Sequence, residues 1–295
     1  MYELIQVGEN SFYMDCPTKV GFYTIGNSEV VLIDSGSDKD AAKKVKKILD
    51  AKGWKLKTIF NTHSHADHIG GNQYLQAQTG CEIYAPGIDR VVTEFPILEP
   101  VMLYGGLPLK ELHNKFLMAK ESEAKPLTKD VLPEGLEMIE LKGHSYDMVG
   151  FKTKDDVIYL ADCLSSMETI EKYKLGFVYD VDSYVKTLEM VKALSAKCFV
   201  PAHAACTDEI ATLAQYNIDK TLEIADKIES LLKNAMNFET LLANVFKEYE
   251  LLMNLQQRML VGSTVKSYLS FLKEADRVEF YFEDNMMLWK KKEAA

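Results

Sequence analysis

The first third of the chain alternates between short apolar runs and one amphipathic segment. β-branched and aromatic residues gather in runs separated by turn-forming residues, which is typical of β-strands. Between residues 37 and 52 the apolar positions recur every three or four residues, which predicts a helix. The predicted strands cover residues 2–7, 11–15, 20–25, 29–34, 56–61 and 82–85, and a second helix ends near residue 79. Strands alternating with helices predict a layered α/β fold.

The pattern of strands resumes only after a long interruption. Residues 96–133 hold many leucines and methionines interleaved with lysine and proline. A segment of this length without regular structure is commonly a lid, although packing on the rest of the fold is an equal alternative. Beyond it, predicted strands cover residues 138–141, 150–153, 156–160 and 198–200, and a predicted helix covers residues 183–194.

From residue 206 onward the pattern becomes helical. An apolar stripe between residues 210 and 232 predicts one long helix. Shorter helices are expected at 237–249 and 263–273, followed by a hairpin of strands 277–282 and 286–290. Three helices and a hairpin form a winged-helix-like arrangement. We therefore expect two domains, a catalytic one at 1–207 and a winged-helix-like one at 208–295.

Composition and charge indicate which classes of molecule this protein can bind. With 47% hydrophobic and 26% charged residues the chain is typical of a folded globular protein, and 34 Lys+Arg against 44 Asp+Glu give a net charge of −10. Such a protein repels nucleic acid and acidic membranes unless it has a local basic surface. From residue 207 onward there are 11 Lys+Arg and 15 Asp+Glu, so the predicted winged helix lacks that surface. We expect a small-molecule substrate.

Cysteine usage and the start of the sequence bear on location. The five cysteines are an odd number without CxxC spacing, which favours a reducing compartment. Residues 1–7 lack a basic segment followed by an apolar run, and no run of about 18 apolar residues occurs. We therefore expect a cytoplasmic protein without a signal peptide or a membrane span.

The chemistry is concentrated where predicted strands end. His63, His65 and His68 fall within six residues, with Asp67 among them, at the end of strand 56–61. On an extended backbone His63 and His65 point to the same side, and Asp67 and His68 can face the same point from the following turn. Imidazole and carboxylate together suit a borderline divalent ion such as zinc. The alternative is a polar loop with chance histidines.

Three more candidate ligands follow later strands. His144 comes shortly after strand 138–141, Asp162 after strand 156–160, and His203 after strand 198–200. Strand ends gather at one edge of a layered α/β fold, and ligands bind there. Each position alone would be a weak signal, but five of the six histidines now share this context.

Together these residues resemble the metallo-β-lactamase superfamily. The similarity lies in Thr62-His-Ser-His-Ala-Asp-His68, Asp34, Gly143-His144-Ser145, Asp162 and His203, and extends over about residues 12–205. It implies an αββα sandwich with a two-metal site at one edge. The ligands that it implies are His63, His65 and His144 for one ion, Asp67, His68 and His203 for the other, and Asp162 between them. Asp34 would orient the histidine loop.

The resemblance implies a metal-dependent hydrolase in which a hydroxide bridges two divalent ions. Zinc is expected, with iron or manganese as alternatives, and Asp67 would orient the attacking group. Tyr146 neighbours His144, and with Tyr104 and His113 it is a candidate substrate contact. Many members continue with Pro-Gly after Gly-His-Ser, whereas Tyr146-Asp147-Met148 follows here, so no member's substrate is carried over. A small ester, thioester or lactone is expected.

Several alternatives remain at this point. A nuclease or phosphodiesterase, or iron-dependent oxygen or sulfur chemistry, would use the same fold. A non-catalytic regulator with a remnant site is disfavoured because the ligand set is intact. Cys163 is expected to be a core residue and not a ligand. The C-terminal segment resembles the winged-helix extension of some hydrolases of this superfamily, where it would pack, cover the site or form a homodimer.

Overall fold

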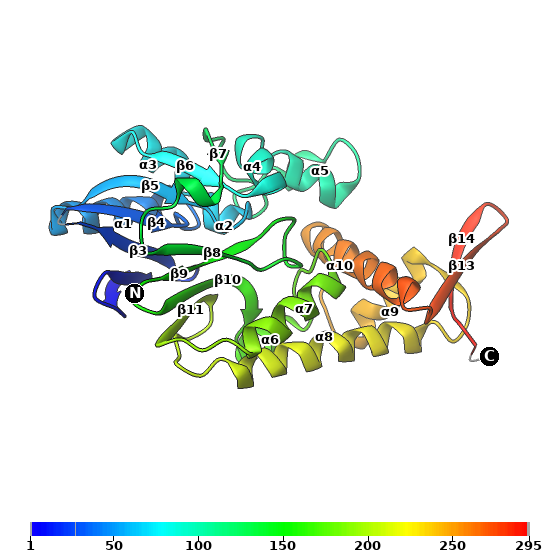
Figure 1. Cartoon of the computed structure of the whole chain (residues 1–295). Helices are drawn as coiled ribbons and strands as arrows, with labels where there is room; N and C mark the ends of the chain where they lie inside the picture. Colours follow the sequence, from blue (N-terminus) through cyan, green and yellow to red (C-terminus); the bar gives the residue numbers. More distant parts are fainter. Residues whose placement is uncertain (1, 27, 294–295) are drawn as a thin grey trace.

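Two β-sheets packed face to face form the centre of the molecule, with helices on both outer sides (Figure 1). The computed structural model describes residues 2–26 and 28–293. The first sheet runs in the order β1 (Glu3–Gln6), β2 (Ser11–Asp15), β3 (Val20–Ile25), β4 (Glu29–Ile33), β5 (Lys55–Phe60), β6 (Glu82–Ala85) and β7 (Lys125–Pro126). The second runs in the order β11 (Cys198–His203), β10 (Val157–Ser165), β9 (Val149–Thr153) and β8 (Leu136–Glu140). The predicted αββα sandwich is confirmed.

Alternation along the strands divides the apolar side chains between two layers. On β2, Phe12 and Met14 join the cluster beneath the outer helices of the first sheet, whereas Tyr13 joins the cluster between the sheets. This is the two-residue period of a strand buried on both faces. Tyr159 of β10 crosses between the sheets, where its hydroxyl donates to the carbonyl oxygens of Phe12 and Phe22 at 2.8 and 3.2 Å. The two sheets are therefore joined by hydrogen bonds as well as by apolar packing.

Helices α1 (Lys39–Lys52) and α3 (Asn72–Thr79) cover the first sheet, and α7 (Val181–Lys192) and α8 (Ala211–Leu231) cover the second. The sequence sets the ends of α1. The Asp38 carboxylate accepts from the Asp40 and Ala41 N–H groups at the N-terminus, and Gly53, with φ 67°, ends the helix in the left-handed conformation. Both ends of this helix are thereby capped.

Three expectations about the site segments need correction. The helix expected to end near residue 79 is preceded by a separate short helix, so the segment holds two helices, α2 (Ala66–Ile69) and α3. Only glycine fits at residue 70 between them, since a Cβ there would lie 2.3 Å from the Ser37 carbonyl oxygen. Asp162 does not follow its strand but lies inside β10, beyond an irregularity at Ala161, where φ is 49°. His203 is the last residue of β11 and does not follow it.

Several helices were missed or shortened by the sequence pattern. Unpredicted helices are α4 (Gly87–Glu94), α5 (Leu98–Tyr104) and α6 (Met167–Tyr173). The last helix, α10 (Leu255–Glu274), begins eight residues before its predicted start at 263. Within the 96–133 segment, Leu103, Leu112 and Leu117 form a small apolar cluster with Met259 of α10. The segment therefore packs on the C-terminal part of the chain.

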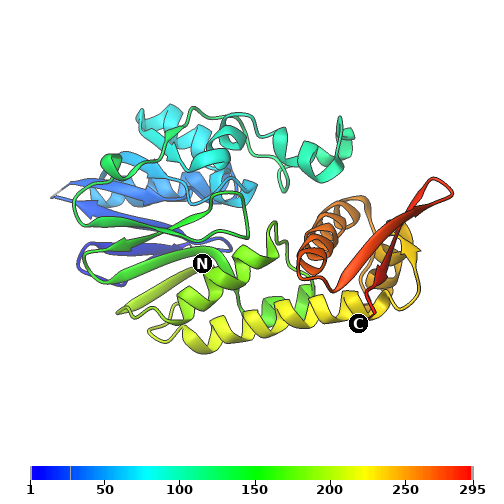
Figure 2. The ribbon, with the colours of Figure 1, turned by 45° about the vertical axis from the view of Figure 1, so that its right-hand side comes forward.

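The C-terminal part consists of α8, β12 (Met236–Asn237), α9 (Phe238–Glu248), α10, β13 (Val278–Glu283) and β14 (Met286–Lys291). Its strands form a third sheet in the order β12-β14-β13, at the far end of α8 from the sandwich (Figure 2). One apolar cluster crosses the expected boundary at residue 208, from Leu160 and Phe199 to Ile218 and Val265. The boundary and the winged-helix character stay predictions. None of the helices in the described ranges combines the length and apolar character needed to cross a bilayer.

Candidate metal centre

Two groups of histidine and aspartate side chains meet at one edge of the sandwich. The first comprises His63, His65, His144 and Asp162, and the second comprises Asp67, His68, Asp162 and His203. Within each group one potential ligand atom per residue lies within 4.8 Å of every other. All seven sequence-predicted ligand residues are therefore brought together, and Asp162 belongs to both groups.

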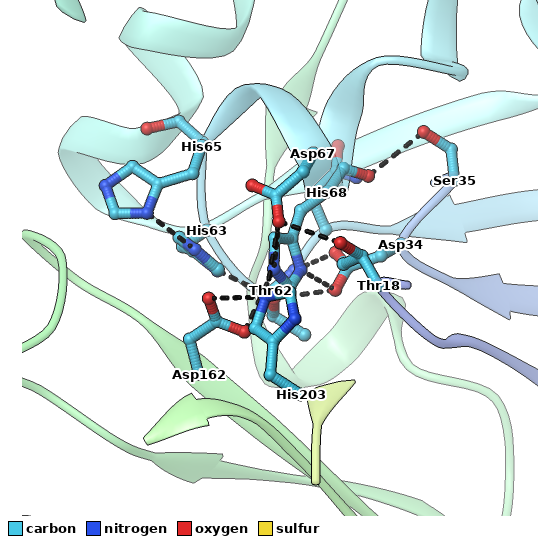
Figure 3. A network of polar contacts seen from close by, with 12 residues as sticks. Thr18, Asp34, Ser35, Thr62, His63, His65, Asp67, His68, Asp162 and His203 are labelled. Carbon is cyan, nitrogen blue, oxygen red and sulfur yellow. Dashed lines mark hydrogen bonds and ion pairs between the residues drawn. The ribbon is translucent and has the colours of Figure 1, made fainter. Parts of the chain in front are cut away.

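The first group is built from the end of the first sheet and, in the second sheet, from one loop and strand β10. Figure 3 shows His63 and His65 on the segment that follows β5. His65 Nδ1 lies 3.0 Å from both His63 Nε2 and His144 Nε2. His144 Nε2 also lies 3.5 Å from an Asp162 oxygen. These nitrogen atoms converge on one point, as the ligands of a single ion do.

The second group surrounds the other side of the Asp162 carboxylate (Figure 3). His68 Nε2 lies 3.0 Å from Asp162 Oδ1, and His203 Nε2 lies 3.2 Å from Asp162 Oδ2. Asp67 Oδ2 is 3.2 Å from His203 Nε2 and 3.8 Å from His68 Nε2. The irregularity at Ala161 places the Asp162 carboxylate between the two groups.

Most of the outward-facing histidine nitrogens have their own acceptor. His144 Nδ1 donates to the Phe177 carbonyl oxygen at 3.1 Å, and His203 Nδ1 donates to the Pro17 carbonyl oxygen at 3.0 Å. His68 Nδ1 donates to Asp34 at 2.7 Å. Such hydrogen bonds fix the tautomer and orientation of a ligand ring. The other ring nitrogen of each of these histidines is thereby directed at the centre.

Asp34 links the two sides of the histidine segment. Besides His68, its carboxylate accepts from the N–H and the hydroxyl of Thr62, both at 2.8 Å. The Thr62 oxygen in turn lies 3.0 Å from His63 Nδ1. Asp34 is 2% exposed and has φ 63°, so the backbone there is held in an uncommon conformation. Asp34 therefore lies beside the histidine segment, and its orienting role there stays a prediction.

Burial and neighbouring charges determine the protonation states of the clustered side chains. Burial and the adjacent imidazoles hold the pKa of His63 well below its usual range, and burial lowers the pKa of His65 to about 4 and that of His144 to about 3. Burial opposes ionisation of Asp162, but His203 and His68 lower its pKa well below normal. The first group thus offers neutral imidazoles beside an ionised carboxylate, which are the metal-binding forms of these side chains.

The residues present fit a pair of divalent cations. His68 Nε2 and Asp162 Oδ1 are fully buried and have no hydrogen-bond partner among the described residues, although the two atoms lie 3.0 Å apart. Buried polar atoms without partners are costly unless an ion satisfies them. Imidazole nitrogen and carboxylate oxygen are also the donor atoms preferred by borderline divalent metals.

The three candidate substrate-contact residues lie in different surroundings. Tyr146 is half-buried, and its ring lies 4.7 Å from that of Tyr179. Tyr104 is 40% exposed at the end of α5, and His113 is exposed after a short turn at Lys110–Leu112. The structure gives neither Tyr104 nor His113 a contact with the seven clustered residues. All three assignments stay predictions. Cys163 is fully buried in the core, as expected.

The sequence pattern missed three residues at this edge. Thr18 donates to Asp67 Oδ2 at 2.8 Å. Glu99 of α5 is buried, with one oxygen 3.8 Å from His65 Nε2, and burial raises its pKa to about 8. Asp89 of α4 is fully buried behind the loops that carry the histidines. None of these three residues belongs to a sequence motif, because each is far from the candidate ligands along the sequence and lies near them only in the folded chain.

This fold and site define a family. The family model described as the metallo-beta-lactamase superfamily matches residues 13–203. The chain belongs to the metallo-beta-lactamase superfamily.

Among curated relatives, the matches are short. A hydroxyacylglutathione hydrolase of Methylococcus capsulatus is 47% identical over 53 residues, which are 18% of this chain and 21% of that protein. One of Rhodospirillum rubrum is 43% identical over 65 residues, 19% of this chain and 25% of that protein. The chain thus aligns with only about a quarter or less of either relative.

Solved structures extend the likeness in fold to nearly the whole chain. A metallo-beta-lactamase family protein of Thermus thermophilus has a TM-score of 0.72 at 16% identity, covering 93% of this chain and 94% of that one. A beta-lactamase domain protein of Burkholderia ambifaria has a TM-score of 0.70 at 13% identity, covering 98% and 94%. The fold of the C-terminal part is therefore shared as well.

A thiol shortly after β11 should react unusually fast. A hydrogen bond from Cys198 lowers the pKa of Cys206 to about 7 against the opposing effect of burial, whereas burial raises the pKa of Cys16 and Cys163. Because the thiolate is the nucleophile, alkylation by iodoacetamide should modify Cys206 first, with a rate that rises through pH 7 and not through about pH 8.5. Mass spectrometry of peptides after timed labelling measures this order. Cys198→Ala should move the midpoint upward, and an unchanged midpoint would contradict the assignment.

Proposed function

We propose that this protein is a metal-dependent hydrolase that cleaves a small thioester. The observation that carries the proposal is the pair of histidine–aspartate groups that share Asp162 at the edge of the sandwich. Membership of the superfamily and the short matches to hydroxyacylglutathione hydrolases support the same reading. Those relatives are named for a thioester, which is one of the three substrate classes expected from the sequence.

We assign the two groups to two divalent ions, with zinc favoured by the donor set. His63, His65 and His144 would hold one ion and Asp67, His68 and His203 the other, with Asp162 between them. When bound, such a pair supplies Lewis acidity and lowers the pKa of water toward neutrality. Iron or manganese in the same positions is the alternative that metal analysis distinguishes.

Asp67 is the residue best placed to orient the attacking water. Its Oδ2 accepts from the Thr18 hydroxyl at 2.8 Å, which fixes the rotation of the carboxylate at the mouth of the centre. Asp67 is ionised, because His68 and the hydrogen bond from His203 lower its pKa although burial opposes this. In the reaction, the water oxygen bonds to the carbonyl carbon and the carbon–sulfur bond breaks. One proton of the water goes to the sulfur, which leaves as a thiol, and the other is released as the carboxylic acid product ionises.

The surroundings of the centre suit a small acyl group. A cavity of about 90 Å³ adjoins His144 and Asp162, and Phe177, Val178 and Ile224 line it. These apolar side chains would cover the acyl part and exclude water from the reacting carbonyl.

A substrate panel on protein of known metal content tests the proposal. The panel contains a hydroxyacyl thioester of glutathione, an oxygen ester, a lactone and a phosphodiester. We expect kcat/KM for the thioester to exceed that for the phosphodiester by at least about 100-fold, because a site built for one leaving group discriminates by differential transition-state binding. Asp67→Asn should remove the thioester activity, which ties the activity to this centre.

Other outcomes would replace the proposal. Preferential phosphodiester cleavage would indicate a nuclease or phosphodiesterase. A single bound iron with oxygen consumption would indicate oxygen or sulfur chemistry, and absence of bound metal would indicate a regulator.

A further inference from the structure

A second buried carboxylate, Asp89 on α4, lies behind the first group of candidate ligands. Its side chain is fully buried, and both of its oxygens accept hydrogen bonds. Oδ1 accepts from the N–H and the hydroxyl of Ser64, at 2.9 and 2.7 Å, and from the Ser145 hydroxyl at 2.6 Å. Oδ2 accepts from the Asp147 N–H at 2.8 Å. Four donors thus converge on one carboxylate.

The donors belong to two segments that are far apart in the sequence. Ser64 stands between His63 and His65, on the segment after β5 of the first sheet. Ser145 and Asp147 follow His144, on the loop between β8 and β9 of the second sheet. Asp89 therefore joins the two segments whose three histidines form the first group.

A further hydrogen bond joins α4 to the same loop, and here the loop supplies the acceptor. The Asp147 carboxylate accepts from the Ile88 N–H at 2.9 Å, so the first turn of α4 and the 143–148 loop hold each other. Gly87 permits this approach, because a Cβ at that position would lie 2.1 Å from Asp147 Oδ2. The helix is thereby fixed to the loop from both sides.

Asp89 and Asp34 act on the candidate ligands in different ways. Asp34 accepts directly from His68 of the second group, and from Thr62, whose oxygen lies 3.0 Å from His63 Nδ1. Within the described residues, Asp89 makes no hydrogen bond with a histidine and acts only through the segments that carry them. Removal of Asp34 and removal of Asp89 should therefore have different effects on the two groups of candidate ligands.

We propose that Asp89 is a positioning residue that sets the distance of His63 and His65 from His144, and so determines the metal affinity of the first group. The inference rests on the proposed metal-binding role of the histidines and not on the thioester reaction. Loss of the Asp89 carboxylate leaves four donors unsatisfied between two loops, and the loops separate to reach water. The second group, which depends on Asp34, keeps its geometry.

The test measures zinc affinity in backgrounds that retain one group each. In His203→Ala protein the first group remains, and in His144→Ala protein the second remains. Metal-free protein is titrated with Zn²⁺ against a chromophoric chelator. We expect Asp89→Ala to weaken zinc binding by about 10- to 100-fold in the His203→Ala background, the range for residues that orient ligands. In the His144→Ala background the change should stay within about threefold, because within the described residues Asp89 makes no hydrogen bond to Asp67, His68 or His203.

A matched control separates positioning from general destabilisation. Asp155 accepts from the Asn10 N–H at 2.6 Å and the Ser11 hydroxyl at 2.8 Å, and lies before β10, at the opposite end of that strand from Asp162. Asp155→Ala should lower the unfolding temperature without changing either zinc affinity. Asp89→Asn, which keeps an acceptor oxygen, and Ser145→Ala, which removes one of the four hydrogen bonds, should lose less affinity than Asp89→Ala and in the same background. These two milder variants decide the matter if Asp89→Ala does not fold.

The outcomes are distinguishable. Loss of affinity confined to the His203→Ala background supports the inference. Equal losses in both backgrounds, or no loss in either, overturn it. Unmodified protein that binds no divalent ion contradicts the proposed function itself, and the inference with it.

Discussion

Replacement of Asp162 by alanine is expected to abolish turnover, with a loss in kcat of roughly 1,000-fold or more, the scale seen when a group essential to transition-state charge stabilisation is removed. Asp162 is shared by both candidate groups, and its oxygens lie 3.0 to 3.5 Å from His68, His203 and His144. Without it, the second group loses a carboxylate ligand and the two groups lose their common member. Metal content per chain should therefore fall together with activity, as measured by elemental analysis and steady-state kinetics.

The neighbouring residue supplies the control. Cys163 is fully buried in the apolar core, and burial raises the pKa of its thiol. Cys163→Ala should reduce stability by about 1 kcal/mol while metal content and kcat stay unchanged. An Asp162→Ala protein that keeps two ions and its activity would remove the basis of the assignment, as would loss of metal from Cys163→Ala.

Removal of metal is expected to lower the unfolding temperature by an amount on the order of 10 °C. An ion that binds only the folded state stabilises it by about 4 kcal/mol when its free concentration is 1,000 times the Kd, and about 1 kcal/mol shifts the midpoint by 2–4 °C in a protein of this size. The physical reason is the set of buried atoms at the centre, notably His68 Nε2 and Asp162 Oδ1, which lack hydrogen-bond partners among the described residues.

Scanning calorimetry with and without a chelator measures this shift. Added Zn²⁺ should restore the original midpoint, and Mg²⁺, which prefers oxygen ligands, should not. The His63→Ala variant offers the matched comparison, because one group is already broken and chelation should shift its midpoint by less. Equal midpoints with and without chelator would show that the centre contributes nothing to stability.

The architecture and the seven clustered residues could be predicted because their signals are local. Phe12, Tyr13 and Met14 show the two-residue alternation of a strand within a single element, and three histidines share one segment of six residues. The resemblance then joined His144, Asp162 and His203 to that segment. Asp162 was placed beyond its strand because nothing in the sequence indicates that β10 continues past the irregularity at Ala161.

Asp89 and Thr18 could not be predicted, for a reason that concerns distance along the chain. Asp89 binds donors 25 and 56 residues away, and Thr18 binds Asp67 49 residues away. Asp89 is an acidic residue in the first turn of α4, which is a common position for one and suggests no function. The packing of the 96–133 segment on Met259 likewise depends on residues more than 140 positions apart.

That packing has a consequence for building hybrid proteins. Leu103, Leu112 and Leu117 share their apolar contacts with Met259, so the 96–133 segment and α10 bury each other. The buried Glu99 beside His65 lies on α5, at the base of the same segment. A chimera that exchanges only the C-terminal helices with a relative would expose those leucines and loosen the support of α5. The two pieces should be transplanted together, as one interchangeable module.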